Sequence, residues 1–319
     1  MAAAHRPISN RHRAWLCAFV AAVFGAATAC AQDASSLRAR HAALQEQLAH
    51  NQFQRPLVIE SNQTDGDLKG DVFSVVDWPH AAVQTALQGT DHWCDLLMVH
   101  LLVKDCRAGT AQPPTLSLAV ARTWDQPLDA AHRIEFHYKT VAATPDYLHV
   151  QLNAEAGPMG TKNYRLMLEA VPLDAKRTFI HMSYSYGYGF AARLAMEGYL
   201  ATLGRNKVGF SITGRGSDGK PVYMGNVRGV VERNTMRYYL ALEAYLGTLA
   251  LPAAQQAERR LNDWFAAVER YPAQLHELEL GQYLALKREQ LQRQQVGASA
   301  LTRVATEARA GDARPVLTP

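Results

Sequence analysis

Short catalytic motifs are missing from the sequence of 319 residues. There is no GxSxG, HExxH or P-loop pattern and no CxxC pair, which leaves out the usual signatures of serine hydrolases, zinc proteases, nucleotide-binding loops and paired-cysteine metal sites. A literal GxGxxG occurs at Gly214, Gly216 and Gly219, but the strand-like run KPVY follows it, where a dinucleotide-binding fold needs the start of a helix. We therefore interpret the glycines as a hairpin turn, and we predict no catalytic residue, no metal and no cofactor.

Long apolar runs are absent beyond the N-terminal 31 residues. At the N-terminus, Arg6, Arg11 and Arg13 precede the apolar stretch AWLCAFVAAVFGAATA, which ends in small residues suited to a signal peptidase. This stretch is shorter than the ~20 apolar residues that cross a bilayer, so an uncleaved anchor is the less favoured alternative. We predict that residues 1–29 are a signal peptide and that the protein is exported to the bacterial periplasm.

Cysteine is scarce, with four in the chain, and Cys17 would leave with the signal peptide. Cleavage after Ala29 would place Cys30 at the new N-terminus, and the preceding Ala-Thr-Ala resembles a bacterial lipobox without its usual leucine. Acylation of Cys30 would anchor the protein to a membrane, whereas cleavage after Ala31 would leave it freely soluble in the periplasm. Both alternatives stay open, with Cys30 as the lipidation candidate.

The two remaining cysteines, Cys94 and Cys106, lie in the body of the chain. Because two cysteines in an oxidising compartment tend to pair, we predict one disulfide between them, with two buried thiols as the alternative.

A strong excess of positive charge is also absent from the mature chain. The formal net charge is +4, and removal of the signal peptide with its three arginines leaves +1. Nucleic-acid-binding domains present a much more basic surface, so we expect no nucleic-acid partner.

The mature sequence begins with a helical pattern and continues with strands. Residues 35–55 form a helical lead-in, in which Leu37, Leu44 and Leu48 mark one amphipathic face. Hairpin strands are expected at Leu57 to Glu60 and Val72 to Val76. From Thr115 onward, four alternating runs separated by turn residues predict antiparallel strands, TLSLAVAR, HRIEFHYKTVA, DYLHVQLNAEA and the hairpin of residues 161–189.

The second strand of that last hairpin carries a face of long, mostly aromatic side chains. At a period of two it presents Ile180, Met182, Tyr184, Tyr186 and Tyr188 on one side. This face either packs as core or lines a cavity in which tyrosine hydroxyls fix the polar end of an apolar ligand.

The C-terminal part of the sequence is helical and charged. Beyond Pro252, a stripe of Leu261, Trp264, Phe265 and Val268 predicts an amphipathic helix that either docks on the body or meets a partner or membrane surface. We assign residues 252–296 to a helical extension and 297–319 to a flexible tail.

One stretch resembles a known family. The strand VFSVVDWP at residues 72–79, a short helix with Val83 and Leu87, and then DHWC at residues 91–94 are similar to the opening of START-like domains of the polyketide cyclase and lipid-transfer superfamily. The resemblance, over about residues 57–251, implies an α+β fold in which a curved antiparallel sheet, with helices on one face, grips a long helix around an apolar cavity.

The chain also departs from that plan. A helix at residues 190–204 and a hairpin at 208–227 stand before the expected gripping helix at residues 230–251. Either this hairpin adds strands to the sheet, or the helix at 190–204 is itself the long helix.

The resemblance implies binding or transport of a lipid or other apolar small molecule, with envelope membrane contact as a further partner. A cyclase- or hydrolase-type enzyme in the same cavity and a ligand-free envelope interaction protein are the alternatives, and we lean against an enzyme. The cavity candidates are Trp93, Tyr164, Met182, Tyr184, Tyr186, Tyr188 and Tyr199.

Ionisable residues on the predicted strands are the only other candidates for chemistry. They are His132, His137, His149, His181, Glu155, Glu169 and Arg165, with Arg193 on the following helix. No metal-ligand spacing emerges among the histidines. We expect charges on the outer face of the sheet rather than a site inside the cavity.

Overall fold

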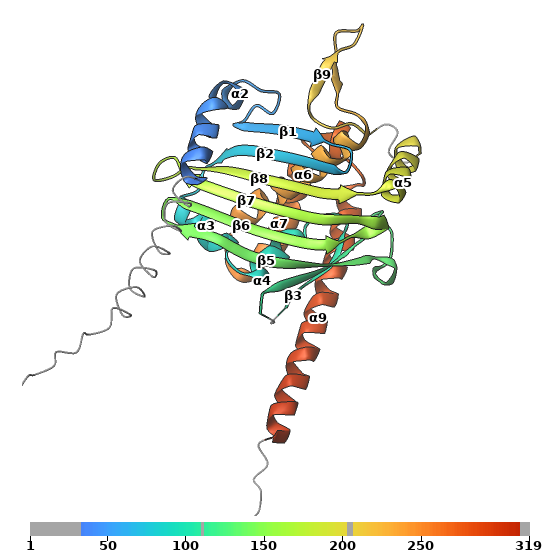
Figure 1. The fold of residues 1–319 in the computed structure, drawn as a ribbon. Helices are drawn as coiled ribbons and strands as arrows, with labels where there is room; N and C mark the ends of the chain where they lie inside the picture. Colours follow the sequence, from blue (N-terminus) through green and yellow to red (C-terminus); the bar gives the residue numbers. More distant parts are fainter. Residues whose placement is uncertain (1–32, 110–111, 203–206, 313–319) are drawn as a thin grey trace, which may run out of the picture.

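The computed structural model describes residues 33–109, 112–202 and 207–312, and they form an α+β fold built on one large, curved antiparallel sheet (Figure 1). The predicted signal peptide and Cys30 lie outside these residues, so both stay predictions. Within the described ranges, no helix combines the length and the apolar content needed to cross a membrane.

The sheet has eight strands in the order β1-β2-β8-β7-β6-β5-β4-β3. Their bounds are β1 Leu57–Gln63, β2 Asp67–Val76, β3 Val103–Ala108, β4 Thr115–Val120, β5 His132–Thr144, β6 Tyr147–Ala156, β7 Thr161–Pro172 and β8 Thr178–Tyr188. All neighbouring pairs are antiparallel, as the short turns predicted. The pairing of β2 with β8 joins the first hairpin to the last strand of the meander, which lies about a hundred residues further along the chain.

The helices form one main layer against this sheet (Figure 1). A helix at residues 33–43 leads into α2 (Gln45–Ala49), and the others are α3 His80–Leu87, α4 Thr90–Leu97, α5 Phe190–Ala201, α6 Asn226–Leu246, α7 Ala253–Val268, α8 Pro272–Leu275 and α9 Leu280–Asp312.

The gripping helix is α6, which packs on β1, β2 and β8. Gly70 of β2 permits this approach, because a Cβ at that position would overlap the hydroxyl of Thr235.

The sequence offered two alternatives for residues 190–227, that the hairpin adds strands to the sheet or that the helix at 190–204 is the long helix, and both are wrong. Strands β9 (Ile212–Arg215) and β10 (Pro221–Tyr223) form a separate two-stranded sheet, and α5 is a shorter helix at the end of β8. The GxGxxG run is the turn of this small hairpin, and Gly219 has a φ of 78° there.

The two faces of the large sheet bury different clusters. The face toward α6 carries the main core, whereas the opposite face carries a smaller one under the N-terminal helices. In that smaller core, Leu37, Leu44 and Leu48 pack with Phe73 and Phe179. The predicted amphipathic lead-in therefore covers one end of the outer face of the sheet.

Helix α7 of the C-terminal extension docks on the body. Leu261, Trp264 and Val268 of α7 are 1%, 2% and 4% exposed, and they belong to the main core. The indole nitrogen of Trp264 donates to the carbonyl of Arg237 at 3.1 Å. Helix α9 continues to Asp312, into the range where we expected a flexible tail. The domain boundaries themselves stay predictions.

The predicted disulfide is present between Cys94 of α4 and Cys106 of β3, with Cα atoms 5.4 Å apart. Both residues are buried in the main core. The bond ties the helix layer to the edge of the sheet.

We expect removal of this disulfide to lower the free energy of unfolding by roughly 3 kcal/mol, because it closes a short loop in the unfolded chain. The measurement is urea unfolding of the oxidised protein against the Cys94→Ala/Cys106→Ala variant. A reductant should destabilise only the former, and equal stability of the two proteins without reductant would contradict the expectation.

A second prediction follows from the packing of α7 on the main core. Leu261→Ala should lower the free energy of unfolding by about 2–5 kcal/mol, since it leaves a cavity in a closed core. The matched control is Leu194→Ala, at a side chain that is 60% exposed, where we expect a change within about 0.5 kcal/mol. Equal effects in thermal or urea unfolding would show that α7 is not part of the cooperative core.

Candidate functional site

The tyrosine strand β8 turns its long side chains toward α6 and into the main core. Met182, Tyr184, Tyr186 and Tyr188 are 1%, 8%, 6% and 6% exposed. The period-two interpretation of the sequence is thus confirmed for the direction of these side chains.

Four tyrosines from three elements form what we call the aromatic cluster, namely Tyr164 of β7, Tyr184 and Tyr186 of β8 and Tyr238 of α6. The ring of Tyr164 stacks on Tyr186 with centroids 5.2 Å apart, and Tyr184 lies 5.7 Å from Tyr186 and 5.2 Å from Tyr238. Tyr238 was not among the cavity candidates, because its helix is joined to β8 only by tertiary contact. The rings interdigitate, so the cluster is closed in this structure.

The cluster hydroxyls differ in their hydrogen bonds. The Tyr164 hydroxyl pairs with Oγ1 of Thr161 at 2.8 Å, and that of Tyr186 donates to Sδ of Met196 at 3.8 Å. No hydrogen bond joins the hydroxyl of Tyr184 or Tyr238 to another described residue. Burial raises the pKa of both phenols, so each stays protonated and able to donate.

The other cavity candidates lie outside the cluster. The hydroxyl of Tyr188 accepts a hydrogen bond from Gln63 and donates one to the carbonyl of Thr64 on the first hairpin. Trp93 is 1% exposed, and its indole nitrogen donates to the carbonyl of Leu87 at 2.9 Å, which joins α4 to α3. The side chain of Tyr199 lies outside the described part of the chain. Ligand binding by any of these residues stays a prediction.

Helix α5 covers one end of the cluster and contacts β8, α6 and the turn before β7. Ala192 is buried and Met196 meets Tyr186, whereas Phe190 and Leu194 are 83% and 60% exposed. Figure 1 shows α5 beyond the end of β8, at the far side of the sheet from α2. This helix therefore has an inner face that closes the cluster and an outer face on which Phe190 and Leu194 are exposed together with the Arg193–Glu197 ion pair.

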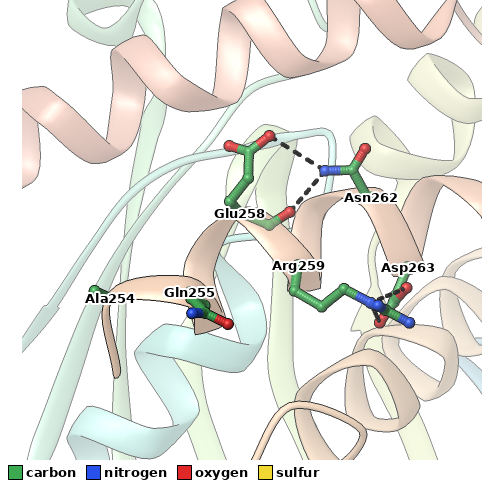
Figure 2. A pocket seen from close by; sticks show the side chains of 6 residues that line it. All are labelled: Ala254, Gln255, Glu258, Arg259, Asn262 and Asp263. Atoms are coloured by element: carbon green, nitrogen blue, oxygen red, sulfur yellow. Dashed lines mark hydrogen bonds and ion pairs between the residues drawn. The ribbon is translucent and has the colours of Figure 1, made fainter. Parts of the chain in front are cut away.

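Two of the hollows on the surface of the described residues are open to solvent. One, of about 470 Å³, lies on α7 (Figure 2). Its polar side chains bind one another, since Asn262 donates to Glu258 and Arg259 pairs with Asp263. The other lies beside Pro127 and Arg293. Neither hollow contains a residue of the aromatic cluster.

The outer face of the sheet carries a separate ionisable group. His181 of β8 lies between two carboxylates, with Nε2 at 2.7 Å from Asp71 and Nδ1 at 2.9 Å from Glu169. Tyr147 donates to the other oxygen of Glu169, and the ring of Phe73 stacks on His181 with centroids 4.3 Å apart. The sequence placed Glu169 and His181 on strands, but Asp71 comes from the pairing of β2 with β8.

The pKa values of this trio shift toward the charged forms. Burial alone would lower the pKa of His181, but its hydrogen bonds with Asp71 and Glu169 outweigh burial and raise it. Burial opposes ionisation of Asp71 and Glu169 as well, yet the bonds with His181 leave both pKa values below their ordinary range. The trio is therefore a largely buried ion network on the face opposite the aromatic cluster.

The remaining ionisable candidates do not assemble into a site. His132, His137, Glu155 and Arg165 are exposed on the strands, and Arg193 pairs with Glu197 along α5. His149 accepts a hydrogen bond from Gln151 at 2.9 Å. Among the residues that the structure describes, no group of three or more His, Cys, Asp or Glu side chains is arranged to hold a metal ion.

The chain matches no protein-family model and no curated protein. Among solved structures, it is similar to a truncated norcoclaurine synthase from Thalictrum flavum at 15% identity, over 45% of this chain and 91% of that one, with a TM-score of 0.30. The Zhui aromatase/cyclase from Streptomyces sp. R1128 has 12% identity over 64% and 95% of the two chains, with a TM-score of 0.29. A conserved protein from Geobacillus kaustophilus has 15% identity over 43% and 86%, with a TM-score of 0.30. At these values the fold assignment rests on the strand order and helix positions described above.

The ion network on the outer face predicts a pH profile. Asp71 and Glu169, with pKa values lowered from 3.8 and 4.5, stabilise the fold above those values and lose this effect as the pH falls. His181, with a pKa raised from 6.5, stabilises the fold below that value and loses this effect as the pH rises through its folded pKa. We expect the contribution of the trio to unfolding free energy to be greatest between about pH 4.5 and 6.5.

Urea unfolding from pH 4 to pH 9 measures this profile. His181→Asn should flatten the decline above pH 6.5, and the exposed His132→Asn serves as the control. An unchanged alkaline slope in His181→Asn would contradict the assignment.

Proposed function

We propose that the protein binds an apolar small molecule, such as a lipid, between the sheet and α6 at the aromatic cluster. The observation that carries this proposal is the pair of hydroxyls on Tyr184 and Tyr238, whose rings meet at 5.2 Å inside the cluster and which form no hydrogen bond with another described residue. A ligand that accepts hydrogen bonds from both phenols would satisfy these donors, while its apolar part replaces contacts between rings.

Helix α5 is the element that admits the ligand in this proposal. Its inner contact with the cluster includes the long sulfur hydrogen bond from Tyr186 to Met196, which is a weak interaction. Movement of α5 away from β8 would open the cluster without disturbing the pairing of the sheet. The exposed Phe190 and Leu194 support contact with an apolar surface such as a membrane while ligand is exchanged.

Binding is favoured over catalysis by the position of the ionisable groups. An enzyme needs an acid-base pair within reach of the bound substrate, whereas the hydrogen-bonded trio of Asp71, Glu169 and His181 lies on the opposite face of the sheet. A ligand-free interaction protein would need an exposed apolar surface. The stripe on α7 does not provide one, because Leu261, Trp264 and Val268 are buried.

Export to the bacterial periplasm is part of the proposal. It rests on the N-terminal sequence, and the Cys94–Cys106 disulfide supports an oxidising compartment. Acylation of Cys30 and a freely soluble form remain the two alternatives, and the intact mass of the mature protein separates them.

Binding is tested with Nile red, a neutral apolar dye, and by native mass spectrometry of protein isolated from its own periplasm. We expect saturable dye fluorescence and a co-purifying lipid that displaces the dye. Tyr238→Phe should weaken the binding of that lipid about 2- to 10-fold, which corresponds to one lost hydrogen bond.

The control is Tyr223→Phe, which changes a tyrosine on the small hairpin. Absence of saturable dye binding together with absence of a co-purifying lipid would overturn the proposal. Equal effects of the two tyrosine substitutions would place the ligand elsewhere.

A further inference from the structure

His100 is a buried histidine beside the aromatic cluster that none of the interactions described so far uses. It lies between α4 and β3 and is 3% exposed. Its ring stacks on Tyr238 with centroids 4.9 Å apart and lies 6.2 Å from the ring of Trp264. Since Tyr238 also meets Tyr184, the histidine extends the cluster into the space under α6.

The hydrogen bonds of His100 define which nitrogen carries the proton. The backbone N–H of Leu102 donates to Nδ1 at 3.2 Å, so the neutral ring carries its hydrogen on Nε2. Nε2 is buried and has no hydrogen-bond partner among the described residues. Burial, with the charges of Arg237 and Lys287, holds the pKa of His100 well below its usual value, so the ring is neutral.

The groups around His100 are rich in donors. Arg237 is 5% exposed and donates through Nη2 to Glu277 at 2.8 Å, while its Nε has no partner among the described residues. Lys287 is fully buried and donates to the carbonyls of His100 and Val103 and to Gln290, with no carboxylate among these partners. The region therefore holds two buried donors without an acceptor among the described residues, the Nε2–H of His100 and the Nε–H of Arg237, and the phenol of Tyr238 lies beside them.

We infer that this region is a subsite for the carboxylate of a long-chain fatty acid, in which the Nε2–H of His100 donates to one carboxylate oxygen. A carboxylate only accepts hydrogen bonds, and it can be buried only where donors and positive charge compensate for lost water. Arg237 supplies that positive charge, and the phenol of Tyr238 is the adjacent donor. The inference rests on the proposed function, since it names the polar end of the ligand that binds at the aromatic cluster.

The test compares dodecanoate with dodecanol as competitors of bound Nile red at pH 8, in the full mature protein. We expect dodecanoate to compete at least tenfold better than dodecanol. His100→Phe keeps the stacked ring but removes the donor, so the two competitors should then differ less than threefold. The control is the exposed His132→Phe, which should retain the full preference.

Each outcome separates the subsite from the binding function. Failure of Nile red to bind the wild-type protein, together with absence of a co-purifying lipid, overturns the proposed function and the subsite together. Dye binding with equal competition by the two molecules overturns the carboxylate subsite and leaves apolar binding intact. A preference that survives in His100→Phe overturns the role of His100.

A second measurement does not depend on the variant folding. In ¹⁵N spectra of wild-type protein, the Nε2 resonance of His100 should shift on addition of dodecanoate and stay in place on addition of dodecanol. No shift with dodecanoate at saturating concentration would overturn the assignment.

Discussion

The packing of α6 into the curve of the sheet is the constraint on which the other features depend. A buried helix must satisfy every polar group that it carries into the core. The fully buried carboxylate of Glu232 accepts from Ser61 and from the backbone of Phe210 and Ser211. About two and three turns beyond it, Tyr239 and Glu243 bind each other and Arg55. These bonds hold β1, the segment after α5 and the N-terminal lead-in to a single helix.

The two faces of the sheet carry different chemistry because strand side chains alternate. Along β8, Met182 and Tyr184 point toward α6, while His181 and Ser183 point to the other side. The inner face is therefore aromatic and weakly polar, and the outer face holds the ion network. The alternation therefore places the trio of Asp71, Glu169 and His181 on the face opposite the aromatic cluster, while Arg237 and Lys287 are charged residues buried near His100.

The segment between β8 and α6 is where the chain departs from a simple helix-grip plan. It supplies α5 and the small β9–β10 hairpin, and neither adds to the large sheet. Helix α5 instead closes one end of the aromatic cluster with Met196, while Phe190 and Leu194 face outward. An insertion at this position can change access to the interior without altering the pairing of β2 with β8.

Local pattern in the sequence was enough for several features. Alternation predicted the strands and the inward face of β8, the run after Gly219 identified a hairpin, and oxidising context predicted the Cys94–Cys106 bond. These features are local because periodicity and turn chemistry act over a few residues. Local pattern did not decide which helix is the gripping helix. Both α5 and α6 have helical patterns, and only the packing of α6 against β2 distinguishes them.

Tertiary structure alone decided which distant side chains meet. His100 lies in the loop between α4 and β3, Tyr184 in β8 and Tyr238 in α6, and Asp71 reaches His181 only through the pairing of β2 with β8. The sequence also showed a face of tyrosines without showing whether it was open or packed. Only the positions of α6 and α5 close it, because contacts between rings depend on the spacing of helix and sheet, which no local period encodes.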